Sequence, residues 1–323
     1  MQKIFNSTYG EIKKAAYALR LGHLVAFPTE TVYGLGADAC NEKAVSRVYS
    51  VKGRPIDHPL IVHISSIEQM DKWAIDIPKY AIEFARQFWP GAMTLILKRS
   101  SVAKDFVTGG QKFVGLRIPS HLVALSLLTE FEKLGGLGVA APSANRFGAL
   151  SPTTSTAVVE ELGQYLESSD LILDGGQSSL GIESTIIDCS QEIPTVLRPG
   201  SITSEMLGIL GNSSESDHLQ KNSMKVSGAL ESHYAPKAKV TVGELAKPGE
   251  GFIAMSNIPT PTGAHRLASP KNLNEFAKEL YEALRDGDRK QLKEVKVIIP
   301  SGQGLAESIR DRVVKAAKKK VGI

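Results

Sequence analysis

The spacing of apolar and polar positions over the first two hundred residues predicts alternating strands and helices. Short apolar runs indicate strands, and apolar positions that recur three and four residues apart indicate helices. Strands are expected over residues 23–27, 60–64, 92–97, 113–118, 138–142, 171–174 and 182–189, with one more that ends near residue 198. Helices are expected over residues 8–22, 41–51, 66–73, 78–89 and 121–133, and from Ser151 onward. This alternation is typical of an α/β domain.

Local signals mark the ends of two of these helices. Thr8 and Glu11 match a capping box, and Asn41 is a suitable N-cap for the second helix. Gly53 and Pro55 follow the second helix, where a glycine lets the backbone bend and a proline stops the helix.

Residues 212–232 separate two parts of the chain. This segment is rich in Ser and Asn and poor in aromatic residues, as linkers are. The pattern after it predicts strand, strand, helix, strand and helix over residues 239–242, 251–255, 272–285, 295–299 and 305–319. A chain of 323 residues also exceeds what one core usually supports. We therefore expect an N-terminal domain over residues 1–211, a linker over 212–237 and a smaller Rossmann-like α/β domain over 238–323.

The composition, with 42% hydrophobic residues, is ordinary for a globular protein. No apolar run is long enough to span a bilayer, and the N-terminus lacks a signal-peptide pattern, so no membrane association is expected. Cys40 and Cys189 have no metal-ligand spacing, which fits a reducing cytoplasm. The seven histidines are scattered, so we expect no protein-bound metal.

The net charge of +4 is unevenly distributed. Residues 1–205 hold 19 Lys+Arg and 21 Asp+Glu, whereas residues 206–323 hold 19 and 13. The basic excess therefore belongs to the C-terminal part, where it would support at most a weak attraction to RNA.

The stretch over residues 51–64 combines two cations with a buried strand. Lys52 and Arg54 flank a glycine at the end of a predicted helix, and His63 lies near the end of the apolar run that follows. Cations presented by a turn at an element end can form an anion site. Alternatively, they only complement the dipole of the preceding helix.

Other stretches also carry candidate ligand contacts. The run over residues 28–36 includes Thr31 and ends in two flexible glycines, and it is either a donor-rich loop beside a ligand or a polar turn between strands. Arg117 lies within an apolar strand and needs an anionic partner, which is either a structural Asp or Glu or a substrate carboxylate or phosphate. Ser143 lies in no nucleophile elbow, so we expect it to form hydrogen bonds only. Arg198 ends another strand, and in open α/β sheets ligands bind at such ends.

Together these motifs resemble the L-threonylcarbamoyladenylate synthases. The matching runs are residues 28–36, 52–55, 58–64, 116–119, 142–145, 184–185 and 197–200. The linker, the run over residues 233–236 and the second domain resemble the long form of the family. The resemblance implies a YrdC-like N-terminal domain with a twisted mixed sheet and a ligand cleft.

The resemblance further implies a nucleotidyltransferase. L-threonine, bicarbonate or CO2, and ATP would give threonylcarbamoyl-AMP and pyrophosphate, with Mg2+ accompanying ATP. The product would pass to a separate transferase complex that forms threonylcarbamoyladenosine next to the anticodon of tRNA. Such chemistry needs positioning and charge neutralisation more than a strong general base, which agrees with a chain that offers cations and hydroxyls.

Site residues follow from the resemblance as well, with Lys52 and Arg54 as the catalytic cations. The implied contacts with ATP are Lys52, Arg54, His58, Ser143, Asn145, Ser151, Arg198 and Tyr234. The implied contacts with L-threonine are Thr31, His63, Arg117 and Ser184. Which cation meets which anion stays open.

The end of the linker, residues 232–237, contains an aromatic, polar side chains and a rigid proline, which a simple spacer does not need. We expect this segment to fold over the cleft as a lid, with Tyr234 against ATP and the second domain as its anchor. Alternatively, Tyr234 packs only against the second domain.

Two other functions compete with the synthase. One is an RNA-binding module, although no RNA-binding motif is present and the N-terminal part is slightly acidic. The other is a hydrolase of small carbamoyl compounds. Threonine-dependent release of pyrophosphate would exclude both as the main activity.

Overall fold

The computed structural model describes residues 4–208, 225–226 and 234–318. The strands of the larger unit are β1 (Ile4–Asn6), β2 (Val25–Phe27), β3 (Gly34–Asp38), β4 (Ile61–His63), β5 (Met93–Lys98), β6 (Phe113–Arg117), β7 (Val139–Ala140), β8 (Leu171–Asp174), β9 (Thr185–Asp188) and β10 (Thr195–Arg198). Its helices are α1 (Tyr9–Arg20), α2 (Glu42–Lys52), the 3-10 helix η1 (Ile67–Gln69), α3 (Met70–Trp73), α4 (Lys79–Phe88), α5 (Asp105–Thr108), α6 (Leu122–Lys133) and α7 (Ser155–Leu162). The smaller unit consists of β11 (Lys239–Val242), β12 (Gly251–Ile253), β13 (His265–Ala268), α8 (Leu273–Arg289), β14 (Glu294–Val297) and α9 (Leu305–Ala317).

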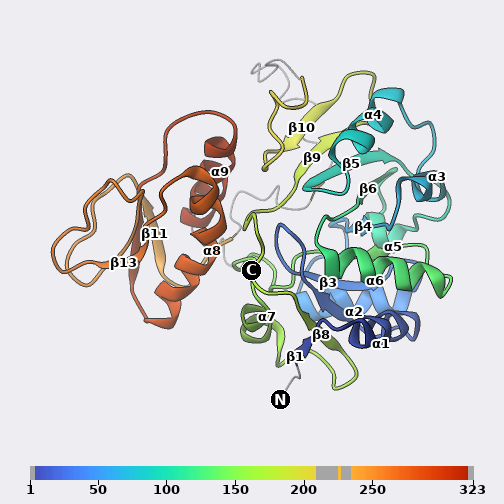
Figure 1. Cartoon of the computed structure of the whole chain (residues 1–323), viewed down its shortest axis with the longest axis horizontal. Coiled ribbons are helices and arrows are strands. Elements are labelled where there is room, and N and C mark those ends of the chain that lie inside the picture. Colours follow the sequence, from blue (N-terminus) through green and yellow to red (C-terminus); the bar gives the residue numbers. More distant parts are fainter. Residues whose placement is uncertain (1–3, 209–224, 227–233, 319–323) are drawn as a thin grey trace.

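Each unit is built around its own sheet. The large sheet has the strand order β1-β8-β2-β3-β7-β4-β6-β5-β9-β10 and mixes parallel with antiparallel pairs. The small sheet has the order β11-β14-β12-β13, and its pairs are parallel. Helices α8 and α9 lie on the side of the small sheet that faces the larger unit (Figure 1). The predicted fold class, a mixed α/β domain with a smaller Rossmann-like α/β unit, is confirmed.

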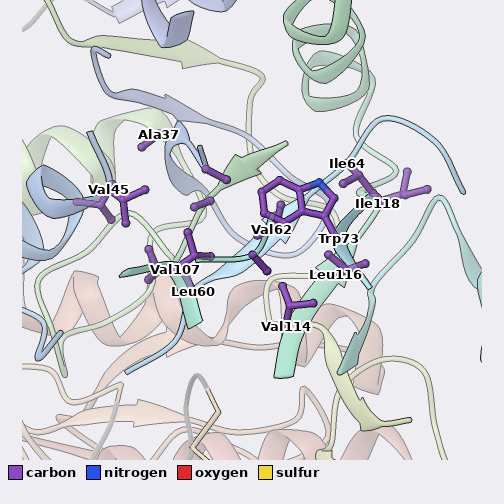
Figure 2. Close-up of a cluster of buried hydrophobic side chains, with 14 of the residues drawn as sticks. Ala37, Val45, Leu60, Val62, Ile64, Trp73, Val107, Val114, Leu116 and Ile118 are labelled. Atoms are coloured by element: carbon purple, nitrogen blue, oxygen red, sulfur yellow. The ribbon is translucent and has the colours of Figure 1, made fainter. Parts of the chain in front are cut away.

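Helices pack on both faces of the large sheet because side chains alternate between the faces along each strand. On β2, Val25 and Phe27 belong to a cluster with α1 and α6, whereas Ala26 belongs to the main core. Figure 2 shows the indole of Trp73 among the core side chains of β4 and β6. Its Nε1 donates to Leu137 O at 3.1 Å, which satisfies the one polar atom of this buried ring.

Capping side chains begin the first two helices as predicted. Thr8 Oγ1 accepts from Glu11 N at 3.3 Å, and Asn41 Oδ1 accepts from Ala44 N at 3.2 Å. Gly53 ends α2 with a φ of 61°, in the left-handed region where a residue without Cβ is favoured. The turn that follows Lys52 therefore depends on this glycine.

The structure corrects the interpretation of residues 28–36 as a loop that ends in flexible glycines. Strand β3 begins at Gly34, and Gly36 lies inside it. A Cβ on Gly36 would lie 2.7 Å from Val139 Cγ1 and 2.9 Å from Phe27 Cε1. Glycine therefore allows close packing at this point of the sheet. The run has neither the alternation nor the β-branched residues by which a strand is recognised.

Other element boundaries also differ from the expected ones. Helix α7 begins at Ser155 with Thr154 as its N-cap, and not at Ser151. Strand β9 begins at Thr185, after the polar pair that precedes it. The apolar pattern does not indicate β1, β13 or α5, which are three or four residues long. Elements this short are stabilised by their neighbours more than by their own sequence.

The two units share a buried apolar contact. Val32, Leu150 and Ile182 of the larger unit belong to the same cluster as Tyr234 and the core of the smaller unit. The contact removes apolar side chains of both units from water. The smaller unit therefore stabilises the segment of the larger unit that contains Val32.

Most of the predicted linker, His233 included, lies outside the described residues. Within the described part, Lys225 N donates to Gln111 Oε1 at 2.9 Å, and Gln111 Nε2 donates to Lys225 O at 2.9 Å. Val226 packs with Ile96 in a small apolar cluster. This short piece therefore lies against the larger unit. The predicted domain boundaries stay predictions.

We expect Gly36→Ala to destabilise the protein by about 1–3 kcal/mol, because the added methyl overpacks the contact with Val139 and Phe27. Urea unfolding followed by circular dichroism measures this change. Gly10→Ala is the control, since Gly10 lies in α1 with only Thr8 Oγ1 near its Cβ position, at 3.9 Å. That variant should keep its stability or gain up to about 1 kcal/mol. Equal stabilities of the two variants would contradict the packing role of Gly36.

Candidate active site

One cleft of the larger unit collects most of the predicted site residues. It encloses about 560 Å³, which includes space open to solvent, between β4, β6 and the loops that adjoin β3, β7, β9 and β10. The predicted residues that line it are Thr31, Arg54, His63, Arg117, Ser143, Ser184, Arg198 and Tyr234. The predicted residues outside the lining are Lys52, His58, Asn145 and Ser151.

The pairing of β4 with β6 determines which side chains occupy the middle of this cleft. The two strands are parallel, and His63 lies opposite Arg117 in their register. Their neighbours Val62 and Leu116 belong to the core, whereas His63 and Arg117 line the cleft. A shift of one residue in either strand would exchange the core and cleft faces.

His63 is buried and neutral. Its ring lies edge-on to Phe27, with centroids 6.0 Å apart. Burial, and next the nearby Arg117, lower the pKa of His63 to about 3. Within the described residues, Nδ1 of His63 has no hydrogen-bond partner. A ligand in the cleft can satisfy this buried polar atom.

Arg117 pairs with the carboxylate of Glu30. A structural Asp or Glu was one of the two partners that the sequence left open for this arginine. Its Nη2 donates to Glu30 Oε1 at 2.7 Å, and Glu30 Oε2 accepts from Ser120 N at 3.0 Å. The Nε of Arg117 donates to Gly91 O at 3.3 Å. These bonds orient a guanidinium that has five N–H donors, so Arg117 can also bind a ligand in the cleft that it lines.

Thr29 orders the loop that carries Thr31. Thr29 Oγ1 donates to Val32 O at 2.6 Å and accepts from the backbone N–H groups of Thr31 and Val32, each at 3.2 Å. The hydroxyl oxygens of Thr29 and Thr31 are 2.8 Å apart. The segment is therefore a polar turn that the Thr29 hydroxyl stabilises, and it also lines the cleft. The two interpretations from the sequence, a polar turn and a loop beside a ligand site, are thus compatible.

Arg54 extends from the glycine turn into the cleft. Its Nη2 donates to Pro59 O at 3.0 Å and its Nε to His58 O at 3.3 Å. Its guanidinium lies 5.6 Å from the ring centroid of Phe147. Burial lowers the pKa of Arg54 to about 10, so the group stays charged at neutral pH. An anionic ligand would stabilise this buried charge.

Arg198 and Ser184 form a single bonded unit. Nε and Nη2 of Arg198 donate to Ser184 O at 3.1 and 2.9 Å, and Nη2 also donates to Ser184 Oγ at 3.2 Å. Ser184 Oγ lies 2.8 Å from Thr94 Oγ1 of β5. Burial is the main cause of a lowered pKa of Arg198. A ligand that moves one of these two side chains therefore affects the other.

Lys52 is buried below the cleft lining and holds a loop. Its Nζ donates to Ser143 O and to Asn145 O, at 2.5 Å each. Burial, and next the charge of Arg54, lower the pKa of Lys52 well below its usual range. The ammonium thereby positions the loop that presents Ser143 to the cleft. A direct contact between Lys52 and ATP stays a prediction.

The remaining predicted residues also have protein partners. The ring of His58 lies edge-on to Phe147 at 5.4 Å, and the amide of Asn145 donates to two carbonyls of the loop after it. Ser151 Oγ donates to Glu183 Oε1 at 2.6 Å. Their contacts with ATP stay predictions.

Tyr234 borders the cleft and also contacts the smaller unit. Its ring stacks on that of Tyr281 of α8, with centroids 5.5 Å apart and planes at 29°. It adopts a φ of 60°, which is uncommon for an aromatic residue, and the next residue, Ala235, donates its N–H to Gly148 O at 3.0 Å. The alternative that Tyr234 packs only against the second domain is therefore incomplete.

Glu183 is a cleft residue that the sequence did not single out. Burial would raise its pKa, but the charges of Arg312 and Arg198 and the hydrogen bond from Ser151 lower it to about 2. Its place directly before Ser184 was a signal in the sequence. Its partner Arg312 lies on α9, and no spacing in the sequence indicates that pairing.

The lining of the cleft has an excess of positive charge, with three guanidiniums and one carboxylate. Within residues 4–208, 225–226 and 234–318, no group of three or more His, Cys, Asp or Glu could hold a metal ion. Over the same ranges no helix combines the length and apolarity needed to cross a membrane. The fold and cleft define a two-unit α/β protein suited to a polyanion beside a small polar ligand.

Comparisons with known proteins identify the family. A family model described as Telomere recombination (Sua5_yciO_yrdC) matches residues 17–200, and one described as Threonylcarbamoyl-AMP synthase, C-terminal domain, matches residues 191–318. A threonylcarbamoyl-AMP synthase of Pyrococcus abyssi is 38% identical over 95% of this chain and 94% of its own length. One of Bacillus subtilis is 36% identical over 95% and 93%. The crystal structure of P. abyssi Sua5 complexed with L-threonine superimposes with a TM-score of 0.87, 35% identity and 98% coverage of both chains.

The chain therefore belongs to the threonylcarbamoyl-AMP synthase family. The predicted family is confirmed, and with it the class of enzyme, a nucleotidyltransferase-type synthase.

The buried His63 should make stability depend on pH. Because its pKa is about 3 in the folded protein and about 6.5 when unfolded, the unfolded chain takes up the proton first as pH falls. Stability is then complete above about pH 6.5 and falls toward pH 3. Between pH 7.5 and 4.5, His63→Gln should lose about 3 kcal/mol less than the wild type in urea unfolding. His265→Gln, at an exposed position of β13, is the control, and a His63→Gln slope like that of the wild type would refute the assignment.

Proposed function

We propose that the cleft forms L-threonylcarbamoyladenylate from L-threonine, bicarbonate or CO2, and ATP, with release of pyrophosphate. The observation that carries this proposal is the meeting of two ligand sets in one cleft. Arg54, Ser143 and Arg198 form a set suited to phosphates, and a second set around His63 and Arg117 suits an amino acid.

L-threonine would bind beside β4 and β6, since its carboxylate matches Arg117 and its hydroxyl matches the polar group of Thr31 and His63. The related P. abyssi protein that was crystallised with L-threonine supports this placement. The neutral His63 neither repels the threonine ammonium nor competes for its carboxylate. Ser184 borders both sets and would orient the two substrates relative to each other.

The chemistry would proceed by addition and displacement. The free amine of threonine adds to CO2 and loses a proton, which gives a carbamate. A carbamate oxygen then bonds to the α-phosphorus of ATP while the bond to the pyrophosphate oxygen breaks, and pyrophosphate carries away the negative charge. Arg54 and Arg198 would neutralise the phosphates and hold them in line for attack.

Mg2+ would arrive with ATP. The described residues include no carboxylate cluster, so the phosphates themselves would hold the ion while the guanidiniums of the cleft bind the phosphates. The ion would supply further neutralisation of phosphate charge.

We also propose that residues 212–237 act as a lid on residues 1–211, with residues 238–323 as its anchor. The position of Tyr234 at the cleft, the bond from Ala235 N to Gly148 O and the contact of Lys225 with Gln111 support this role. The lid would exclude water from the activated intermediate and release the product on opening.

The product would supply a separate transferase complex that modifies tRNA next to the anticodon. Weak RNA binding by the basic C-terminal part and a cytoplasmic location remain predictions. An assay of ATP–pyrophosphate turnover with each of the twenty amino acids, with and without bicarbonate, tests the proposed activity directly. Turnover independent of threonine would refute it.

Removing either phosphate-facing cation should strongly reduce the reaction. We expect Arg54→Ala and Arg198→Ala to lower threonine-dependent pyrophosphate release by about 10²–10³-fold, since each loses a charged donor to the transition state. Steady-state kinetics measure the loss. Arg86→Ala, on the exposed side of α4, is the control and should keep full turnover. Full turnover in Arg54→Ala or Arg198→Ala would contradict its assignment.

The hydroxyl-lined wall of the cleft should select threonine. Valine leaves the buried polar groups near Thr31 and His63 unpaired, so we expect its kcat/KM to fall at least 10³-fold below that of threonine. Serine lacks only a methyl and should lose about 1–3 kcal/mol of transition-state binding. Competition assays with the three amino acids measure both differences, and equal turnover of valine and threonine would exclude a hydroxyl-reading site.

A further inference from the structure

A buried carboxylate links the two units at the cleft. Glu183 is 6% exposed, lines the cleft, and accepts hydrogen bonds from Ser151 Oγ at 2.6 Å, Tyr281 OH at 2.9 Å and Arg312 Nε at 2.9 Å. Ser151 belongs to the larger unit, whereas Tyr281 and Arg312 lie on α8 and α9 of the smaller one. The smaller unit is therefore bonded to a residue of the cleft itself.

Arg312 spans the two segments that carry cleft side chains. Its Nε bonds to Glu183, the residue before Ser184, and its Nη2 donates to the carbonyl of Pro199, the residue after Arg198, at 2.9 Å. Ser184 and Arg198 are themselves bonded to each other. The fully buried guanidinium of Arg312 thus bonds to the residue before Ser184 and to the residue after Arg198. Ser184 and Arg198, which bond to each other, both line the cleft.

The same group also contacts the aromatic residue at the cleft edge. The Cζ of Arg312 lies 5.4 Å from the ring centroid of Tyr234, within the range of a cation–π contact. Tyr281, which shares Glu183 with Arg312, stacks on the same ring. Displacing Arg312 would therefore disturb Glu183 and Tyr234 together.

The pairing of Arg312 with Glu183 affects Arg198, the cation that we assign to the phosphates of ATP. The groups that face Glu183 are Arg312 of α9, Tyr281 of α8, Tyr234 before β11 and Arg198 at the end of β10. Without Arg312, Glu183 would be a buried carboxylate whose neighbouring cation is Arg198. Arg198 would then turn toward Glu183 and away from the phosphates.

We propose that Arg312 is a positioning residue of the cleft, which acts through Glu183 and Pro199 to keep Arg198 available to ATP, so that the cleft is complete only with the smaller unit in place. This inference rests on the proposed synthase function. It gives the smaller unit a direct part in nucleotide binding, beyond anchoring a lid.

The first test compares two arginines that cross the same interface in the full-length protein. Arg312→Met should raise the KM for ATP at least tenfold at pH 7.5. Arg289 of α8 binds Glu160 of α7 through Nε and Nη2 at 3.0 Å each, and neither residue lines the cleft. Arg289→Met should therefore change the KM for ATP less than twofold. An equal loss in both variants would show that docking alone matters, and would overturn the proposal.

A second variant separates positioning from a merely structural role. Arg312→Met combined with Glu183→Gln leaves no carboxylate at position 183 for Arg198 to turn toward, so it should recover most of the lost ATP affinity. A KM for ATP in the double variant that stays as high as in Arg312→Met alone would reject the proposed mechanism, because a merely structural loss would not be rescued by removing the carboxylate.

Folding and function are controlled separately. Thermal unfolding establishes whether each variant is folded. If Arg312→Met does not fold, the KM values for ATP of Tyr281→Phe and of the double variant test the proposal instead. Tyr281→Phe removes one hydrogen bond to Glu183 and should raise the KM for ATP about threefold or more; a wild-type value would count against the proposal. If the wild-type protein releases no pyrophosphate with threonine, the proposed function fails, and calorimetry with ATP alone still tests Arg312.

Discussion

The register between β4 and β6 is the constraint on which the cleft depends. These parallel strands place His63 opposite Arg117, and the alternation of side chains sends their neighbours into the core around Trp73. The burial of Val62 and Leu116 therefore stabilises a register that presents both polar side chains to a ligand. The apolar core that holds the sheet together is thus also what aligns the polar side of the cleft.

Around these strands, buried charges are held by backbone carbonyls and by carboxylates. Lys52 bonds to two carbonyls of the Ser143 loop, Arg54 to two carbonyls after its own turn, and Arg117 to Glu30. Each bond satisfies a charge that burial alone would disfavour and fixes its direction. A cleft organised in this way is preorganised for phosphate chemistry, in which positioning and charge matter more than proton transfer.

The smaller unit is part of this organisation. Its helices α8 and α9 face the larger unit, and its core includes Tyr234 together with Val32 and Leu150 (Figure 1). Glu183 and Arg312 extend that contact into the cleft as a buried ion pair at 2.9 Å. Desolvation offsets much of the attraction in a buried pair of this kind, whereas removing one partner alone leaves a costly buried charge. In this chain the contact between the two units therefore reaches the lining of the cleft.

The sequence by itself determined the α/β class, the helix caps at Thr8 and Asn41, the glycine turn at Gly53, the family, and most of the polar residues that line the cleft. These features depend on local propensity, periodicity and short motifs, which can be recognised in the sequence alone. Strand β3 could not be predicted in this way, because its glycines allow close packing against side chains from other strands. Only the tertiary structure decided that Lys52 supports a loop from below the cleft and that Glu183 pairs with Arg312, 129 residues away, since such partners are chosen by how the sheet and the two units pack.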